Sequence, residues 1–273
     1  MSIVCVGDFG KGNGDQLKVA ALIKKITGEK DVKLVLGLGD NIYPDGVKGV
    51  KDKKFKVQFE EMYKRLPKSL EFFNVLGNHD YMGNCNAQIE YTKKSKRWNL
   101  FNHWYHFDKT LGKSRVKVRF YAIDTNFDQL TSNMKTKQLK EISTALENSN
   151  CDWNIVYGHH PFKSTGYHGN AEGELADFYN SLVETGKVHF MLAGHDHDQQ
   201  LFNIPNVPTL VVSGTGSEAH HVPRVFRLNP QLEFYSEKLG VCSIDFISKT
   251  SVELTFYDAD NVNLFKKIIT KKN

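Results

Sequence analysis

The chain has few cysteines, and none of them lie at the spacing typical of a thiolate metal site. The four cysteines, at positions 5, 85, 151 and 242, lie far apart and form no CxxC pair. Two of them fall within apolar, strand-like runs, where a free cysteine behaves as a small buried hydrophobic residue. The sequence therefore predicts no disulfide framework.

Long apolar runs and secretion signals are also missing from the sequence. No stretch approaches the roughly 20 apolar residues that are needed to span a bilayer, and no Asn-X-Ser/Thr glycosylation acceptor occurs. The first strand-like run begins at Ser2, which leaves no room for the charged and apolar regions of a signal peptide. We therefore expect a cytoplasmic or otherwise intracellular protein without membrane association. A secreted or lysosomal protein whose leader had been removed would look the same.

A strong excess of either charge is absent as well. The chain has 36 basic and 31 acidic residues among 273, a net charge of +5 that is spread along the sequence. The densest basic segments, 51–54 and 93–97, are typical of solvated surface, and no nucleic-acid-binding motif accompanies them. We expect a monomer that binds no nucleic acid and slightly favours anionic substrates. The 40% hydrophobic content supports a sizeable core.

Five short polar motifs each follow an apolar run that is typical of a strand. They are Gly7-Asp8-Phe9-Gly10, Gly39-Asp40-Asn41-Ile42-Tyr43, Gly77-Asn78-His79-Asp80, Gly158-His159-His160-Pro161 and Gly194-His195-Asp196-His197-Asp198. Two Asp, one Asn, one Tyr and three His from these motifs supply seven oxygen and nitrogen ligands. Seven ligands are too many for one ion, but they suit two ions about 3.5–4 Å apart that share a bridging carboxylate.

The spacing of apolar residues predicts alternating strands and helices. Strands are expected at 3–6, 33–38, 72–76, 116–123, 154–157 and 189–192, and helices at 16–27, 55–65, 136–146 and 175–184. Four further strands, at 209–213, 240–247, 251–257 and 263–269, are expected to form an antiparallel tail. Because the motifs span the first 200 residues or so, a cut in that stretch would divide the site, and we expect a single domain over 1–273. We expect two stacked sheets flanked by helices, with the site outside the carboxyl ends of the strands.

These motifs resemble the purple acid phosphatases, in particular the small tartrate-resistant acid phosphatase branch of the calcineurin-like metallophosphoesterases. The resemblance covers nearly the whole chain and includes the stretch from Gly77 to Asn99. Tyr43 indicates the subfamily, because a tyrosine at this place is the ligand that gives the family its purple colour. The resemblance implies a four-layer α/β/β/α sandwich with two mixed sheets, the metallophosphoesterase-type fold in the α/β class.

The resemblance also implies a role for individual residues. Fe(III) would be held by Asp8, Tyr43 and His197, a divalent Fe, Zn or Mn ion by Asn78, His159 and His195, and Asp40 would bridge both. The resemblance also implies that His79 and His168 donate a proton or a hydrogen bond to the leaving group of the substrate. Mammalian relatives commonly have Tyr in the position of His160, so this histidine either contacts the substrate phosphate or lines the cleft.

The activity implied is an acid phosphatase that hydrolyses phosphate monoesters by attack of a metal-bound hydroxide. Its substrate would be a phosphorylated small molecule or a phosphoprotein. The same motifs also fit a phosphodiesterase or a nucleotide or phosphoprotein phosphatase. A catalytically silent scaffold on the same fold is an alternative of a different class, as is a phosphate-binding sensor. The short segment after Asp124-Thr125 does not imply the proteolytic activation that mammalian relatives undergo.

Overall fold

Side chains of the first strand, β1 (Ser2–Val6), alternate between two apolar environments. Ile3 and Cys5 pack in the layer between two sheets, whereas Val4 and Val6 pack on the outer side, in the same cluster as residues of helix α1 (Gly14–Glu29). Successive side chains of a strand point to opposite faces of its sheet. Both faces of this strand are therefore covered, which is the environment of a parallel strand in an α/β fold.

The computed structural model describes residues 1–112 and 115–271, and it contains two stacked seven-stranded sheets. The first sheet has the order β14-β13-β12-β1-β2-β3-β4. Its strands β1 to β4 are parallel, and β12 to β14 continue it antiparallel. Besides β1, its strands are β2 (Val32–Gly37), β3 (Glu71–Asn74), β4 (Trp98–Asn99), β12 (Gly240–Phe246), β13 (Ser251–Asp258) and β14 (Asn263–Thr270).

The second sheet has the order β11-β9-β10-β8-β7-β6-β5. Four neighbouring strands, β10, β8, β7 and β6, are parallel, and the remaining strands pair antiparallel at the two edges. The strands are β5 (Tyr105–Leu111), β6 (Val116–Ala122), β7 (Trp153–Tyr157), β8 (Phe190–Ala193), β9 (Gln199–Phe202), β10 (Thr209–Ser213) and β11 (Leu232–Ser236). Both sheets are therefore mixed.

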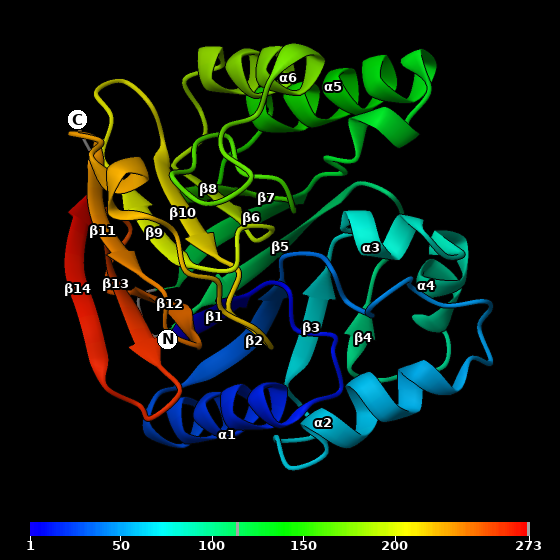
Figure 1. The fold of residues 1–273 in the computed structure, drawn as a ribbon. Coiled ribbons are helices and arrows are strands. Elements are labelled where there is room, and N and C mark those ends of the chain that lie inside the picture. Colours follow the sequence, from blue (N-terminus) through cyan, green and yellow to red (C-terminus); the bar gives the residue numbers. More distant parts are fainter. Residues whose placement is uncertain (113–114, 272–273) are drawn as a thin grey trace.

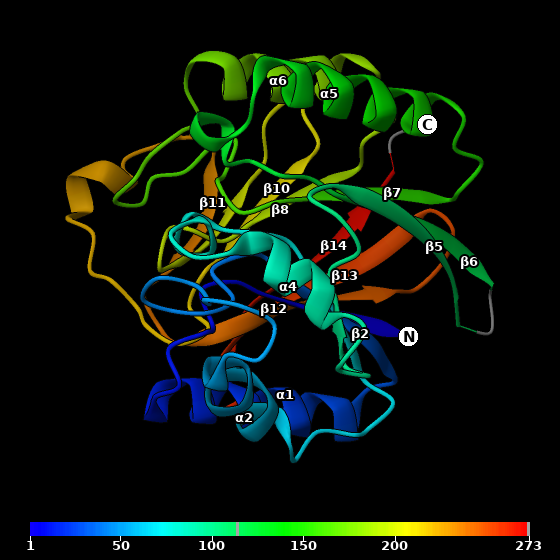
Figure 2. The same ribbon diagram turned by 90° about the vertical axis from the view of Figure 1, so that its right-hand side faces the viewer.

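Helices cover the outer face of each sheet (Figures 1 and 2). On the first sheet lie α1 and the helical segment formed by η1 (Phe55–Glu60) and α2 (Glu61–Tyr63); on the second lie α5 (Ser132–Glu147) and α6 (Gly173–Glu184). The short helices α3 (Asn78–Tyr81) and α4 (Cys85–Tyr91) follow β3, and two short 3-10 turns, η2 (Phe127–Gln129) and η3 (Arg224–Arg227), lie in loops. The predicted four-layer α/β/β/α sandwich with two mixed sheets is confirmed. No helix in the described part of the chain is long and apolar enough to cross a membrane.

One part of the expected topology is wrong. Residues 209–213 were expected to begin an antiparallel tail, but β10 lies in the second sheet, parallel to β8, whereas β12 to β14 lie in the first sheet. The reason is β9, which follows the last motif and pairs antiparallel with β10. This strand begins with two glutamines that are buried and hydrogen-bonded, so it lacks the apolar pattern by which a buried strand is usually predicted.

Candidate metal centre

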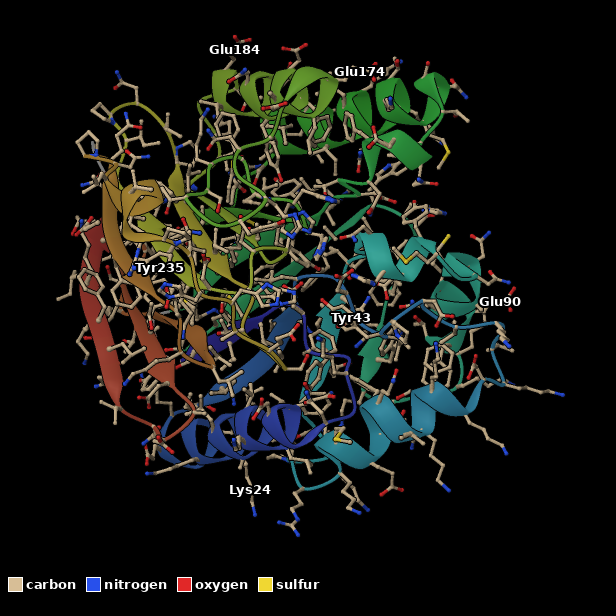
Figure 3. All side chains as sticks on the ribbon, in the orientation of Figure 1. Lys24, Tyr43, Glu90, Glu174, Glu184 and Tyr235 are labelled. Atoms are coloured by element: carbon tan, nitrogen blue, oxygen red, sulfur yellow. The ribbon has the colours of Figure 1, made fainter. Side chains whose placement is uncertain are left out.

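Each predicted metal ligand lies beyond the carboxyl end of a parallel strand. The strands concerned are β1, β2, β3, β7 and β8, and the side chains are Asp8, Asp40, Tyr43, Asn78, His159, His195 and His197. The carboxyl ends of parallel strands share one edge of their sheet, and the two stacked sheets bring both edges together. In Figure 3, Tyr43 lies within the molecule near these strand ends, whereas Lys24 and Glu90 lie at the periphery.

The first group of ligands forms around the hydroxyl of Tyr43. Its Oη lies 3.1 Å from Oδ1 of Asp8, 2.9 Å from Oδ2 of Asp40 and 3.2 Å from Nε2 of His197. Asp8 and Asp40 are almost completely buried. Burial and the two neighbouring carboxylates raise the pKa of Tyr43 far above its ordinary value, so without a cation its hydroxyl stays protonated.

The second group forms around the ring of His159. Its Nε2 lies 3.0 Å from Oδ1 of Asn78, 3.2 Å from Nδ1 of His195 and 3.5 Å from Oδ2 of Asp40. Oδ2 of Asp40 is therefore close to both groups, as a bridging carboxylate would be. The structure places the seven predicted ligands close together, in the two groups that the resemblance implies.

The chemistry of the second group indicates that it holds a positive charge. Nδ1 of His159 lies 2.9 Å from the carbonyl oxygen of Leu38, which can only accept a hydrogen bond, so Nδ1 carries a proton. In the neutral ring, the Nε2 lone pair would then face the amide oxygen of Asn78 and the carboxylate of Asp40, which are also acceptors. A metal ion satisfies all three atoms at once. The residues present therefore fit a metal site.

The titration of His159 agrees with this interpretation. Its complete burial opposes the charged form, but the Asp40 carboxylate and neighbouring hydrogen bonds outweigh burial and raise its pKa to about 10. The same ring, in turn, lowers the pKa of Asp40 to about 2 against the effect of burial. In the absence of a metal ion, a proton on the ring of His159 therefore supplies the positive charge. Burial and the surrounding imidazoles lower the pKa of His195, which keeps this ring neutral and able to bind a metal.

The ligand loops adopt backbone conformations that most residues avoid. Asp8, Asp40 and His195 have φ values of 58°, 51° and 68°, in the left-handed region. Such strain is typical of functional sites, where the surrounding structure holds it in place. A Cβ on Gly77 would lie only 2.2 Å from Oδ1 of Asp40, so the loop before Asn78 can approach the bridging carboxylate only with glycine at this position.

Asp80 has a structural role at the site that we did not predict from the sequence. Its buried carboxylate accepts hydrogen bonds from the backbone N–H groups of Asn41, Ile42 and Gly77 and from the side chain of Gln88. It thereby ties the loop after β2 to the loop after β3. Burial, and then the negative charge of Asp40, raise the pKa of Asp80 to about 6. Its place in the Gly77–Asp80 motif was the available signal.

The three further histidines predicted at the site lie beside the ligands. Nε2 of His79 is 3.9 Å from Oδ2 of Asp40, and its ring packs 4.5 Å from that of Tyr43. The rings of His168 and His160 lie 4.1 Å and 4.3 Å from the ring of His195. Burial and the positive charge on His159 lower the pKa of His160 to about 3, so this ring is neutral. His79, His168 and ligands of both groups line one cavity of about 560 Å³.

A comparison with protein families identifies this arrangement. The sequence pattern of the calcineurin-like phosphoesterases matches residues 1–199. The chain belongs to the calcineurin-like phosphoesterase family. Calcineurin-like phosphoesterases use a dinuclear metal centre, and in this phosphoesterase Asp and His side chains of the two groups could bind metal ions.

Curated relatives agree with the more specific resemblance to purple acid phosphatases. Purple acid phosphatase 7 of Arabidopsis thaliana is 29% identical over 293 residues, covering 100% of this chain and 87% of the relative. Tartrate-resistant acid phosphatase type 5 of Homo sapiens is 30% identical over 258 residues, covering 87% of this chain and 79% of the human protein. The predicted membership of this phosphoesterase in that branch is confirmed.

Two solved structures share the phosphoesterase fold. One is described as GAP50, the anchor in the inner membrane complex of Plasmodium; it has a TM-score of 0.89 and 23% identity, over 100% of this chain and 89% of that one. A purple acid phosphatase from yellow lupin seeds has a TM-score of 0.73 and 16% identity, over 99% of this chain and 53% of that one. At these identities the likeness concerns the fold alone.

Two acidic residues that we did not predict lie against site histidines of this phosphoesterase or the loop that carries them. Oδ1 of Asp196 accepts the backbone N–H of His168 at 2.8 Å, and its other oxygen accepts the hydroxyl of Ser164, which fixes the loop that carries His168. Oε2 of Glu218 lies 3.2 Å from Nδ1 of His197 and also pairs with Lys11. A carboxylate behind a ligating histidine orients the ring and raises its basicity. No motif marks Glu218 in the sequence.

Proposed function

We propose that this phosphoesterase is an acid phosphatase that hydrolyses phosphate monoesters at an Fe(III) and divalent metal pair. The single observation that carries the proposal is the position of Asp40, whose Oδ2 lies near Tyr43 of one ligand group and near His159 of the other. Two ligand groups that share a carboxylate are the arrangement of two-metal hydrolases.

The ligand chemistry supports the assignment of the two metals. Asp8 and the phenol of Tyr43 provide anionic oxygens once the phenol is ionised, and such oxygens suit the harder trivalent ion. The second group supplies one amide oxygen and two imidazoles of its own, which suit Fe(II), Zn(II) or Mn(II). When bound, the two ions would neutralise the phosphoryl oxygens and activate a water molecule for attack.

The remaining residues would act on the leaving group. His79 and His168 line the same cavity as the ligands, and each has a ring beside a ligand ring. A proton or hydrogen bond donated by His79 or His168 would stabilise the departing alkoxide. The substrate we propose is a phosphorylated small molecule or a phosphoprotein.

The first test is the rate of para-nitrophenyl phosphate hydrolysis as a function of pH, on protein whose bound metals have been counted. The proposal predicts two metals per chain and a rate maximum on the acid side, with no hydrolysis by the same protein after chelation. A neutral or alkaline maximum would contradict the iron assignment and indicate two divalent ions. Absence of turnover by fully metallated protein would contradict the monoesterase proposal and favour a diesterase or a silent scaffold.

A further inference from the structure

A second and larger cavity, of about 650 Å³, lies beside the metal centre. It shares Asn78, His168 and His195 with the cavity over the ligands. Its other walls come from the segment 125–129, which follows β6, and from the segment 169–175, which leads into α6. The two cavities therefore meet at the second group of ligands, and a molecule with its phosphate at the metals can extend into the larger one.

Among the residues that the structure describes, the walls of this cavity carry acidic side chains and no lysine or arginine. Asp128, Glu172 and Glu174 line it. Glu174 forms an ion pair with Lys135 at 2.5 Å, whereas Asp128 and Glu172 have no cationic partner within residues 1–112 and 115–271. The amino end of α6 also faces the cavity, but a helix end contributes only about half a positive charge. The two unpaired carboxylates exceed it, so the wall is net negative.

A buried hydroxyl fixes a hydrogen-bond donor at the cavity wall. The hydroxyl of Thr125 accepts the backbone N–H groups of His159 and His160, so its single hydrogen points to Nδ1 of His160, 2.9 Å away. His160 therefore carries its proton on Nε2 and is a donor at the cavity wall rather than a metal ligand.

We propose that this acidic cavity is the subsite for the leaving group and that it selects monoesters of small alcohols that carry a positive charge, such as amino alcohols. The inference rests on the proposed phosphatase function and names its substrate class. Asp128 and Glu172 would attract the cationic end of the alcohol and repel anionic leaving groups. Nε2 of His160 would donate a hydrogen bond to an oxygen of the alcohol.

The test compares two monoesters of similar size and opposite charge, phosphoethanolamine and phosphoglycolate, on zinc- and iron-loaded protein. We expect a larger kcat/KM for phosphoethanolamine. In Asp128→Asn and in Glu172→Gln, the ratio of the two kcat/KM values should each time fall by about 2- to 5-fold. In wild type the ratio should also fall at about 0.5 M salt, because dissolved ions screen the attraction between exposed charges. Glu184→Gln is the matched control, since Glu184 lies on α6 at the surface, outside the lining of the cavity (Figure 3).

A binding measurement separates this inference from the proposed function. Calorimetry with 2-aminoethylphosphonate and 3-phosphonopropionate reports affinity without turnover, and wild type should bind the aminated phosphonate more tightly. Equal affinity for both, or a preference that survives in the Asp128→Asn, Glu172→Gln double variant, would overturn the subsite even if para-nitrophenyl phosphate is hydrolysed. A charge preference in binding without any hydrolysis would support the subsite and contradict the phosphatase. Failure to bind either phosphonate would overturn both.

Discussion

The two halves of the metal centre share Asp40 but differ in the charge of their ligands and in the residues that lie behind those ligands. The half around Tyr43 contains the carboxylate of Asp8 and a phenol that can ionise, and Glu218 and Lys11 stand behind its histidine. The half around His159 contains only an amide and imidazoles besides Asp40, and a backbone carbonyl fixes its central ring. The choice of ligand alone can therefore place a site that suits a hard trivalent ion beside one that suits a softer divalent ion on the same fold.

The largest expected effect comes from removing what the halves share. Asp40→Ala deletes the oxygen that lies near both groups, so metal content should fall at both sites and hydrolysis should drop by about 10³-fold or more. Elemental analysis and the para-nitrophenyl phosphate assay measure the two effects. Asp245→Ala, which removes a partly buried carboxylate at the far end of β12, is the matched control. Full activity and full metal content in Asp40→Ala would exclude the two-metal assignment.

His79→Ala tests a residue that touches the shared carboxylate without belonging to either half. Its ring lies 3.9 Å from Asp40 and is partly exposed. We expect turnover to fall by about 10²-fold, the contribution typical of a general acid, with both metals retained. The loss should be smaller for a substrate with a good leaving group, such as para-nitrophenyl phosphate, than for an alkyl phosphate. If the variant instead lost its metals, His79 would be a ligand.

Glu218→Gln should weaken the half around Tyr43 and leave the other half unchanged. Loss of the carboxylate that lies 3.2 Å from His197 should lower the affinity for iron by about 10-fold or more, the usual effect of removing a partner behind a metal ligand. Competition with a chelator measures each metal separately. Glu237→Gln is a control, because this residue contacts His221 and Tyr235 instead. If the affinity for both metals fell equally, the proposed action of Glu218 on the Tyr43 half alone would be contradicted.

Tyr43→Phe should change the colour of the protein more than its stability. The ring packs in place, but the variant cannot provide a phenolate to Fe(III), so the visible charge-transfer absorption should disappear. We expect the second half to bind its divalent ion as in wild type, and turnover to fall by about 10-fold through loss of one iron ligand. Absorption spectra of the iron-loaded protein decide the point. A purple variant would mean that another group colours the centre.

Metal-free protein tests the half around His159 through stability instead of catalysis. The folded pKa of His159, about 10, lies above the ordinary value of 6.5, so the stability that this ring contributes is complete below pH 6.5 and is lost as the pH rises through 10. We expect metal-free protein to lose about 1–3 kcal/mol of stability between pH 7 and 10. Metal-free His159→Gln, measured by urea unfolding over the same range, should lose less. Identical pH profiles for the two proteins would contradict the role of this ring.

Much of the site could be predicted from the sequence because its ligands follow apolar strands. Asp8, Asp40 and His159 each follow, after one glycine, a short apolar run typical of a buried strand, and parallel strands present their carboxyl ends at one edge. Glu218 could not be predicted in this way. It lies in a loop after β10, and only the pairing of β10 with β8 brings that loop to His197. Pairing between distant segments leaves no local pattern.

Among the strands, too, those with an apolar run could be predicted and those without one could not. Strands with apolar runs, such as β1 and β7, were predicted to within a residue or two of their ends. Strand β5 was missed, because it lies at a sheet edge and alternates partly exposed with exposed side chains, among them Asp108 and Lys109. Strand β9 was missed because Gln199 and Gln200 are buried through hydrogen bonds rather than through apolar packing. Polar burial of this kind depends on partners elsewhere in the chain.

The position of β1 in the first sheet has a consequence for the order in which the protein is made. β1 carries Asp8 at its end and is flanked by β2 on one side and by β12 on the other. During synthesis, the edge of β1 that pairs with β12 stays open until residues 240–246 leave the ribosome, long after β1 itself and the loop that carries Asp8 have done so. We therefore expect stable metal uptake to follow the synthesis of β12 rather than that of the motifs that carry the ligands.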